Sequence, residues 1–194
     1  QNEYPWAKSV IVLAVPYGNY KIPESVRGHI AKAYLFDTRV DTNVKEYQHR
    51  LKMEKYLNEL GLKAAAKPFG LVALRWAALQ AGIGIIRRNN FLYTQSGSWV
   101  QLEAWLTDAE MELRETPDIP PCPEGCSRCR EACPTHSLSD AYTMSPTSCI
   151  SFLTTFGGRD LPSDPLREKF GECIYGCDIC QNVCPMNRGT SQEK

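Results

Sequence analysis

The sequence has no long apolar run, no excess of charge of either sign and very little histidine. No uninterrupted apolar stretch approaches the roughly 20 residues that a membrane-spanning helix requires, so we expect no membrane partner. Lysine plus arginine and aspartate plus glutamate are equal at 22 each, which removes the electrostatic basis for strong nonspecific binding to nucleic acid. Only 3 histidines are present, and none follows a cysteine pair at the spacing used by zinc fingers.

Cysteine is what the chain has in abundance, with 9 residues, of which all but one fall into two runs in the C-terminal third. Each run ends in a Cys-Pro dipeptide. Short spacings of this kind are typical of ligands for two [4Fe–4S] clusters, where the last cysteine of each run binds the other cluster. This crossover predicts the following ligands: for cluster one Cys122, Cys126, Cys129 and Cys184, and for cluster two Cys133, Cys149, Cys177 and Cys180.

Structural zinc and a disulfide framework are alternative interpretations of the same cysteines. CxxC pairs bind zinc as readily as iron, whereas disulfides indicate an oxidising compartment. The two Cys-Pro endings favour iron–sulfur clusters over both alternatives. Such thiolates are kept reduced in the cytoplasm, which is the localisation we expect. Cys173 is left over, and we interpret it as a small buried residue near a cluster rather than as an exchangeable ligand.

The remainder of the chain has the pattern of a mixed α and β protein. A continuous β-branched run and an alternating run predict two strands, and apolar residues at helical spacing predict two helices. The predicted strands cover 9–15 and 98–106, and the predicted helices cover 44–60, with Gly61 as its C-cap, and 71–80. Four prolines between 117 and 123 indicate a linker, so we expect a domain boundary near residue 116.

A loop at 81–90 combines Gly82 and Gly84 with Arg88 and Asn89. Glycine lets a backbone approach a ligand closely, and arginine and asparagine side chains hydrogen-bond amide or phosphate groups. The motif alone is a weak signal, because Gly-x-Gly is also typical of a plain turn and no full dinucleotide-binding fingerprint follows.

Several motifs together resemble the epoxyqueuosine reductase family, which is related in plan to the reductive dehalogenases. They are Ala81–Asn89, Gly97–Val100, Leu106–Asp108, Cys129–Thr135, Cys149–Ser151 and Ile174–Pro185. The resemblance implies an α+β fold, in which a nitroreductase-like cobalamin-binding domain, at 1–116 and N-terminally truncated, precedes a ferredoxin-like domain with two [4Fe–4S] clusters at 117–194. It also implies an oxidoreductase that passes electrons through both clusters to cobalamin. The corrin contacts that it implies are Gly82, Gly84, Arg88, Asn89, Ser98, Ser151, Tyr175 and Gly176.

The sequence departs from that family where the family has its presumed proton donor, because 66–74 contains no carboxylate. We therefore assign no catalytic residue. A segment at each end of the family's sequences is expected to be missing, which together with the neutral charge makes modified tRNA a doubtful partner. The expected partners are a redox protein as electron donor and either a corrinoid protein or a small electrophilic substrate. The alternative function is a two-cluster electron carrier of ferredoxin type without cobalamin.

Overall fold

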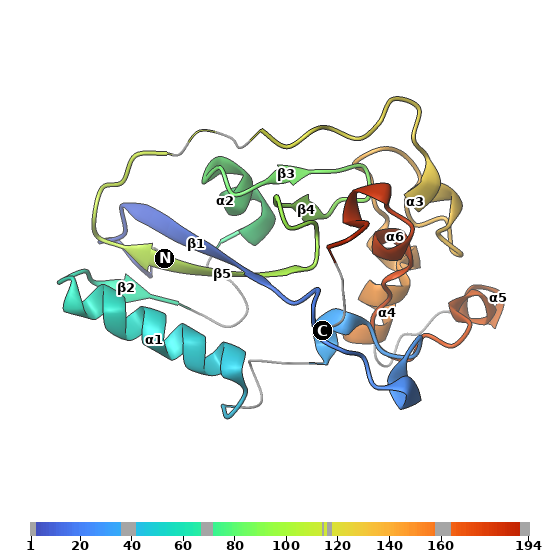
Figure 1. The fold of residues 1–194 in the computed structure, drawn as a ribbon, viewed down its shortest axis with the longest axis horizontal. Helices are drawn as coiled ribbons and strands as arrows, with labels where there is room; N and C mark the ends of the chain where they lie inside the picture. The colour runs from blue at the N-terminus through green and yellow to red at the C-terminus, as the bar shows by residue number, and fades with distance from the viewer. Residues whose placement is uncertain are drawn as a thin grey trace. The chain divides into compact units, whose positions relative to one another are not determined.

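A computed structural model describes residues 3–35, 42–66, 72–113, 115, 118–157 and 164–190 (Figure 1). The chain forms two compact units, and each is assembled from separate stretches of sequence. Unit 1 consists of Gln1–Val15, Phe36–Gly84 and Gln101–Asp118, and unit 2 consists of Pro16–Leu35, Ile85–Val100 and Ile119–Lys194. The domain boundary expected near residue 116 therefore stays a prediction. The stretches of the two compact units alternate along the chain, so no single position in the sequence separates them.

Unit 1 is built around a sheet with the strand order β1-β5-β2. The strands are β1 (Ser9–Pro16), β5 (Val100–Thr107) and the short β2 (Ala64–Ala65), which runs antiparallel to β5. Both long strands were predicted from their apolar and alternating residues. Trp105 of β5 is completely buried, as expected for an aromatic residue on the inner face of a strand.

The two predicted helices are present as α1 (Lys45–Glu59), which runs beside β2, and α2 (Leu74–Gln80) (Figure 1). Leu57 of α1 is buried, but Leu51 and Tyr56 are exposed, so the apolar face is narrower than the spacing predicts. The helix ends at the predicted cap. Gly61 has a φ of 76°, and its N–H donates to Asn58 O at 2.9 Å.

Gly82 ends α2 in the same way. Its φ is 67°, its N–H donates to Leu79 O at 3.1 Å, and the N–H of Ile83 donates to Ala78 O at 3.0 Å. These two bonds define a Schellman motif, which requires a left-handed residue that glycine supplies without steric cost. The structure thus gives Gly82, predicted from the resemblance to face a corrin, the role of a helix cap.

The replacement of Gly61 by alanine is expected to lower the free energy of unfolding by about 1 kcal/mol. The cost comes from the left-handed backbone alone, because no atom lies within 4 Å of the Cβ that alanine would add. Urea unfolding of both proteins measures it. Asn58→Ala, an exposed change in the last turn of α1, is the control and should change the free energy by less than about 0.5 kcal/mol. Equal unfolding midpoints for Gly61→Ala and the parent chain would contradict the prediction.

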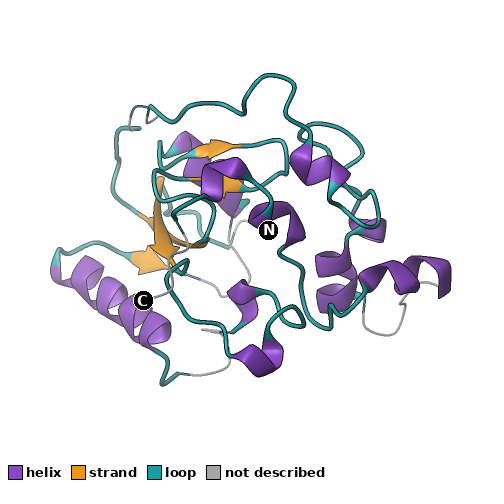
Figure 2. Cartoon of the chain, turned by 45° about the vertical axis from the view of Figure 1, so that its right-hand side comes forward, coloured by secondary structure: helices purple, strands orange, loops and turns teal. Residues whose placement is uncertain are grey.

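Unit 2 has little regular structure, and its helices are short (Figure 2). It contains the hairpin β3 (Ile85–Ile86) and β4 (Leu92–Tyr93), and the helices α3 (Arg128–Glu131), α4 (Ile150–Phe156), α5 (Asp164–Arg167) and α6 (Ile179–Asn182). Single 3-10 turns lie at Glu24–Val26, Lys32–Tyr34, Pro146–Ser148, Glu168–Phe170 and Pro185–Asn187. α3 packs against α6, which brings the two cysteine runs together.

The early segment of unit 2 is joined to the second cysteine run through its backbone. The N–H of Ala31 donates to Tyr175 O at 2.8 Å, and the N–H of Ile174 donates to His29 O at 2.8 Å. Beside these bonds, Ile150, Leu153 and Phe170 form a small apolar core. Residues far apart in sequence therefore hold the turn at 174–176.

Taken together, the elements give an α+β architecture, as predicted. A nitroreductase-like, cobalamin-binding character for the first domain stays a prediction. Within the part of the chain that the structure describes, no helix has the length and apolar character needed to cross a membrane.

Candidate metal centre

Four cysteines from both runs line one cavity in unit 2, which we call the cluster-one cavity. They are Cys122, Cys126, Cys129 and Cys184, the four predicted ligands of cluster one. The other lining residues are Arg87, Arg88, Asn89, Pro123, Arg128, Pro185 and Met186. Within the described residues, no three His, Cys, Asp or Glu side chains are grouped for a single metal ion. A [4Fe–4S] cluster does not need such a group, because its thiolates bind different irons.

Arg87 supplies an independent test of whether this cavity suits an iron–sulfur cluster. Its side chain is only 2% exposed, and its Nη2 donates to Pro120 O. Among the described residues, its Nε and Nη1 have no hydrogen-bond partner. A buried cation with unpaired N–H groups is unfavourable unless an anionic ligand completes its contacts. A cluster held by four thiolates is negatively charged, so the residues present fit this group.

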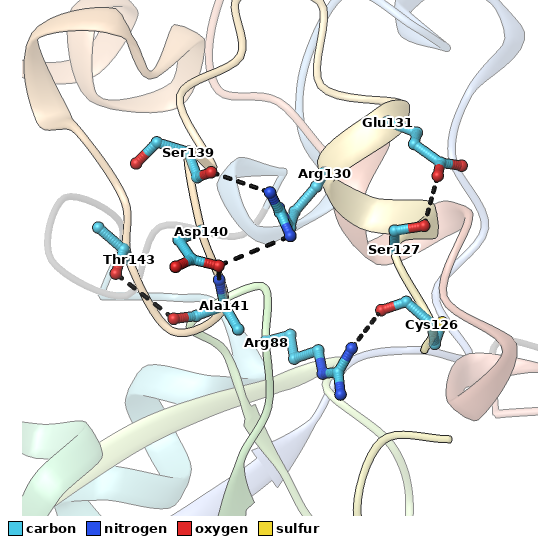
Figure 3. A network of polar contacts seen from close by, with 9 residues as sticks. All are labelled: Arg88, Cys126, Ser127, Arg130, Glu131, Ser139, Asp140, Ala141 and Thr143. Carbon is cyan, nitrogen blue, oxygen red and sulfur yellow. Dashed lines mark hydrogen bonds and ion pairs between the residues drawn. The ribbon is translucent and has the colours of Figure 1, made fainter. Parts of the chain in front are cut away.

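Arg88 and Arg130 hold the loops that carry the first cysteine run (Figure 3). Arg88 Nη1 donates to Cys126 O at 2.8 Å. Arg130 Nη2 donates to Ser139 O at 3.0 Å, and its Nη1 lies 3.6 Å from the carboxylate of Asp140. Charge-assisted bonds to the backbone fix the direction in which the cysteines of these loops project.

Asn89 and Tyr93 connect residues next to both predicted clusters. Asn89 Nδ2 donates to Tyr93 OH at 2.9 Å and to Cys180 O at 3.3 Å. The Tyr93 hydroxyl also lies beside the thiol of Cys184. Burial raises the pKa of Tyr93 well above its ordinary value, so the hydroxyl keeps its proton.

Ser98 lies in a second buried polar group that anchors the end of the second run. Its Oγ donates to Gln181 Oε1 at 2.8 Å, and Asn187 Nδ2 donates to Ser98 Oγ at 2.7 Å. Asn187 Nδ2 also donates to Gln181 O at 3.0 Å. These bonds bind the α6 region to the segment after β4 and satisfy side chains that would otherwise be buried without partners.

Cys180 lies near predicted ligands of cluster two. Burial and, after it, the neighbouring thiols of Cys149, Cys129 and Cys133 raise the pKa of its thiol to about 12. Two of these neighbours, Cys149 and Cys133, belong to the predicted ligand set of cluster two. A thiol in such a place loses its proton when iron supplies the compensating positive charge.

Cys177 and Cys173 are hydrogen-bonded to each other and pack against the core of unit 2. This bond lowers the pKa of Cys173 to about 7 and raises the pKa of Cys177 far above its ordinary value. Cys173, interpreted from the sequence as a small buried residue near a cluster, is half-buried and packs against the core beside the predicted ligand Cys177.

A second cavity, of about 410 Å³, borders Cys177, and we call it the Cys177 cavity. Lys32 on its wall is buried, and Lys32 Nζ donates to Gly18 O at 2.6 Å and lies 5.8 Å from the ring centroid of Trp99. Asp178 accepts the backbone N–H of Lys32 at 2.6 Å, and burial raises the pKa of its carboxyl. The remaining lining residues are Ile22, Arg27, Gly28, Ile30, Ala31, Cys173, Gly176, Ile179 and Asn182.

The predicted corrin contacts do not come together in either unit. Arg88, Asn89 and Ser98 form hydrogen bonds around the cysteine runs, which leaves their polar groups engaged within the protein. Gly176 borders the Cys177 cavity, and Tyr175 beside it packs against Tyr34 with ring centroids 4.5 Å apart. Gly82 and Gly84 belong to unit 1, and Ser151 lies on α4. A role of these residues in binding a corrin stays a prediction.

The position of the missing family aspartate lies mostly outside the described residues, which omit 67–71. Several residues around the cavities were not predicted from the sequence as site residues: Lys32, Arg87, Tyr93, Gln181 and Asn187. The alternation of side chains along an extended chain was a weak signal for Arg87. Ile85–Ile86 forms a strand, and continued alternation puts Arg87 on the same side as Asn89, which is buried.

Comparison with known proteins gives the relationship. Residues 122–187 match the family described as a 4Fe-4S double cluster binding domain. Epoxyqueuosine reductase from Staphylococcus aureus is 33% identical over 198 residues, which cover 98% of this chain and 51% of the relative. The Bacillus subtilis enzyme is 33% identical over 197 residues, which cover 95% of this chain and 49% of that protein. This chain therefore spans about half the length of the curated relatives it matches.

A crystal structure of an epoxyqueuosine reductase with a tRNA-TYR epoxyqueuosine-modified tRNA stem loop is also similar. It has a TM-score of 0.77 and 33% identity and covers 96% of this chain and 50% of that chain. The sequence-based doubt about modified tRNA is wrong, because a relative that matches nearly all of this neutral stretch was solved with such a tRNA. This chain is a homologue of the epoxyqueuosine reductases and carries a 4Fe-4S double cluster binding domain at 122–187.

Proposed function

We propose that this chain provides the electron-transfer part of an epoxyqueuosine reductase-type oxidoreductase. The observation that carries the proposal is the cluster-one cavity, where thiols from both cysteine runs meet the buried, incompletely bonded Arg87. When bound, [4Fe–4S] clusters supply one-electron transfer. The chain holds the ligands close together through the contact of α3 with α6, and through the bonds of Arg88 to Cys126 in the first run and of Asn89 to Cys180 in the second.

We infer the direction of electron transfer between the clusters from the difference between the two cavities. Cys184 belongs to the cluster-one cavity, whereas Cys177 borders the roomier Cys177 cavity of about 410 Å³. We place the electron acceptor at the Cys177 cavity and the reduced redox protein that donates electrons on the cluster-one side. The relatives support epoxyqueuosine in tRNA as the substrate of the whole protein. We propose the cytoplasm as its location, because thiolates are kept reduced there.

Two [4Fe–4S] clusters require about eight iron and about eight acid-labile sulfide per chain after anaerobic purification. Iron and sulfide analysis with a parallel zinc assay measures this. Stoichiometric zinc with almost no iron would contradict the proposal, because the same thiols bind zinc.

Cobalamin is the electron acceptor that the family resemblance implies. An anaerobic titration of the protein with cob(II)alamin, followed by EPR, tests it. Loss of the axial nitrogen coupling near one equivalent supports a corrinoid oxidoreductase. No binding supports the second candidate function, a two-cluster electron carrier, which the engagement of Arg88 and Ser98 in hydrogen bonds around the cysteine runs favours.

A further inference from the structure

The surroundings of the two predicted clusters differ in their balance of charge. Three arginines line the cluster-one cavity: Arg87 is buried, Arg88 is half-buried and Arg128 is exposed. Near Cys177 and Cys180, the covered carboxyl of Asp178 instead lies beside the buried cation Lys32, whose backbone N–H it accepts, so that opposite charges balance each other there. Charges in such positions act strongly on a redox centre, because little water screens them.

Tyr93 adds a directed hydrogen bond to this difference. Its side chain is 1% exposed, and the guanidinium of Arg87 lies 4.9 Å from its ring centroid. Asn89 Nδ2 donates to the hydroxyl oxygen of Tyr93, so the hydroxyl proton points away from Asn89. The thiol of Cys184 lies within hydrogen-bond reach of this hydroxyl. The hydroxyl of Ser98 donates to Gln181 and so does not compete as a donor to that sulfur.

We propose that Arg87 and Tyr93 together raise the reduction potential of cluster one above that of cluster two. The inference rests on the proposed function, in which both clusters are present. Reduction adds one electron, taken from the reduced redox protein, and therefore one negative charge to the cluster. A buried cation and an O–H donor to a ligand sulfur both stabilise that added charge.

At cluster two, the carboxylate of Asp178 opposes the addition of negative charge and offsets the buried Lys32 beside it. Cluster one is thus the first to be reduced and stores an electron. Cluster two, beside the Cys177 cavity, is the stronger reductant of the pair once it is reduced. Arg87 and Tyr93 are thus positioning residues, which act through cluster one and determine which cluster is reduced first.

The test is an anaerobic redox titration of the full chain monitored by EPR, which gives two midpoint potentials. In Arg87→Gln and in Tyr93→Phe, one midpoint should move to a more negative value, and the other should stay. The midpoint that moves should be the one that disappears in Cys184→Ala. Arg87→Gln should give the larger shift, because it removes a full buried charge.

Two matched controls separate tuning from a general disturbance. Arg128→Gln makes the same change of charge at an exposed arginine of the same cavity, and solvent screening should reduce its shift well below that of Arg87→Gln. Tyr142→Phe removes the hydroxyl of an exposed tyrosine in unit 2 and should move neither midpoint.

Iron content distinguishes failure of this inference from failure of the proposed function. A parent chain without two clusters would overturn the proposed function. Unchanged midpoints in Arg87→Gln and Tyr93→Phe proteins that keep all their iron would overturn the tuning role. If either variant loses iron, 3-fluorotyrosine at position 93 decides, because it keeps the ring and the hydroxyl and is a stronger donor. A more positive midpoint then supports the inference, and an unchanged one overturns it.

Discussion

Replacement of Cys184 by alanine is expected to halve the iron content, from about eight to about four atoms per chain. The cluster that disappears should be the one bound by the first cysteine run, because Cys184 lines the same cavity as Cys122, Cys126 and Cys129. A cluster that has lost one of its four thiolates is held too weakly to survive purification. Iron and sulfide analysis of anaerobically purified variants provides the measurement.

Double variants show which cysteines share a cluster. Cys184→Ala combined with Cys129→Ala should leave about four irons, because both changes remove the same cluster. Cys184→Ala combined with Cys180→Ala should leave almost none, since Cys180 lies among the thiols predicted for cluster two. The reverse pattern, with iron retained in the second combination, would refute the crossover of the two runs.

Replacement of Gly176 by alanine is expected to lower the stability of unit 2 by about 2–4 kcal/mol, through left-handed strain and overpacking. Gly176 has a φ of 78°, and a Cβ there would lie 2.5 Å from both Ala31 Cβ and the ring of Tyr34. Its N–H also donates to Thr154 Oγ1 at 2.9 Å, so the backbone is held in place against the clash. The next residue is Cys177, and a shift here should also weaken cluster two.

Gly189 provides the matched control, because it has the same φ of 78° but no atom of the described residues lies within 4 Å of an added Cβ. Gly189→Ala should therefore show only the backbone cost, about 1 kcal/mol. The comparison uses urea-unfolding midpoints of cluster-loaded proteins under anaerobic conditions, with iron measured on the same samples. Equal midpoints for the two alanine variants would show that the contact with Tyr34 is not a rigid constraint.

The sequence predicted the elements whose signal is local. The β-branched run of β1 and the helical spacing of α1 with its cap at Gly61 are complete within short windows. The cysteine spacing is also local within each run, and the crossover of Cys184 came from the general chemistry of paired clusters. These features needed no knowledge of the tertiary structure.

The rest depends on contacts between distant segments, which a single sequence does not encode in a readable pattern. Ala31 pairs with Tyr175, and Ser98 pairs with Asn187, so unit 2 crosses the predicted boundary twice. Arg87 and Arg88 look alike in the sequence, and only the fold buries the first and leaves the second half-buried. The difference decides which arginine influences a cluster, because burial determines the screening of its charge.

The interleaved make-up of unit 2 has a consequence for the order of events on the ribosome. Pro16–Leu35 leaves the ribosome on the order of 10 s before Ile119, at synthesis rates of about 5–20 residues per second. Throughout that interval the backbone partner of Ala31 does not yet exist. The early segment stays unfolded or bound to a chaperone during this time. Insertion of cluster one can be completed only after Cys184 has been synthesised.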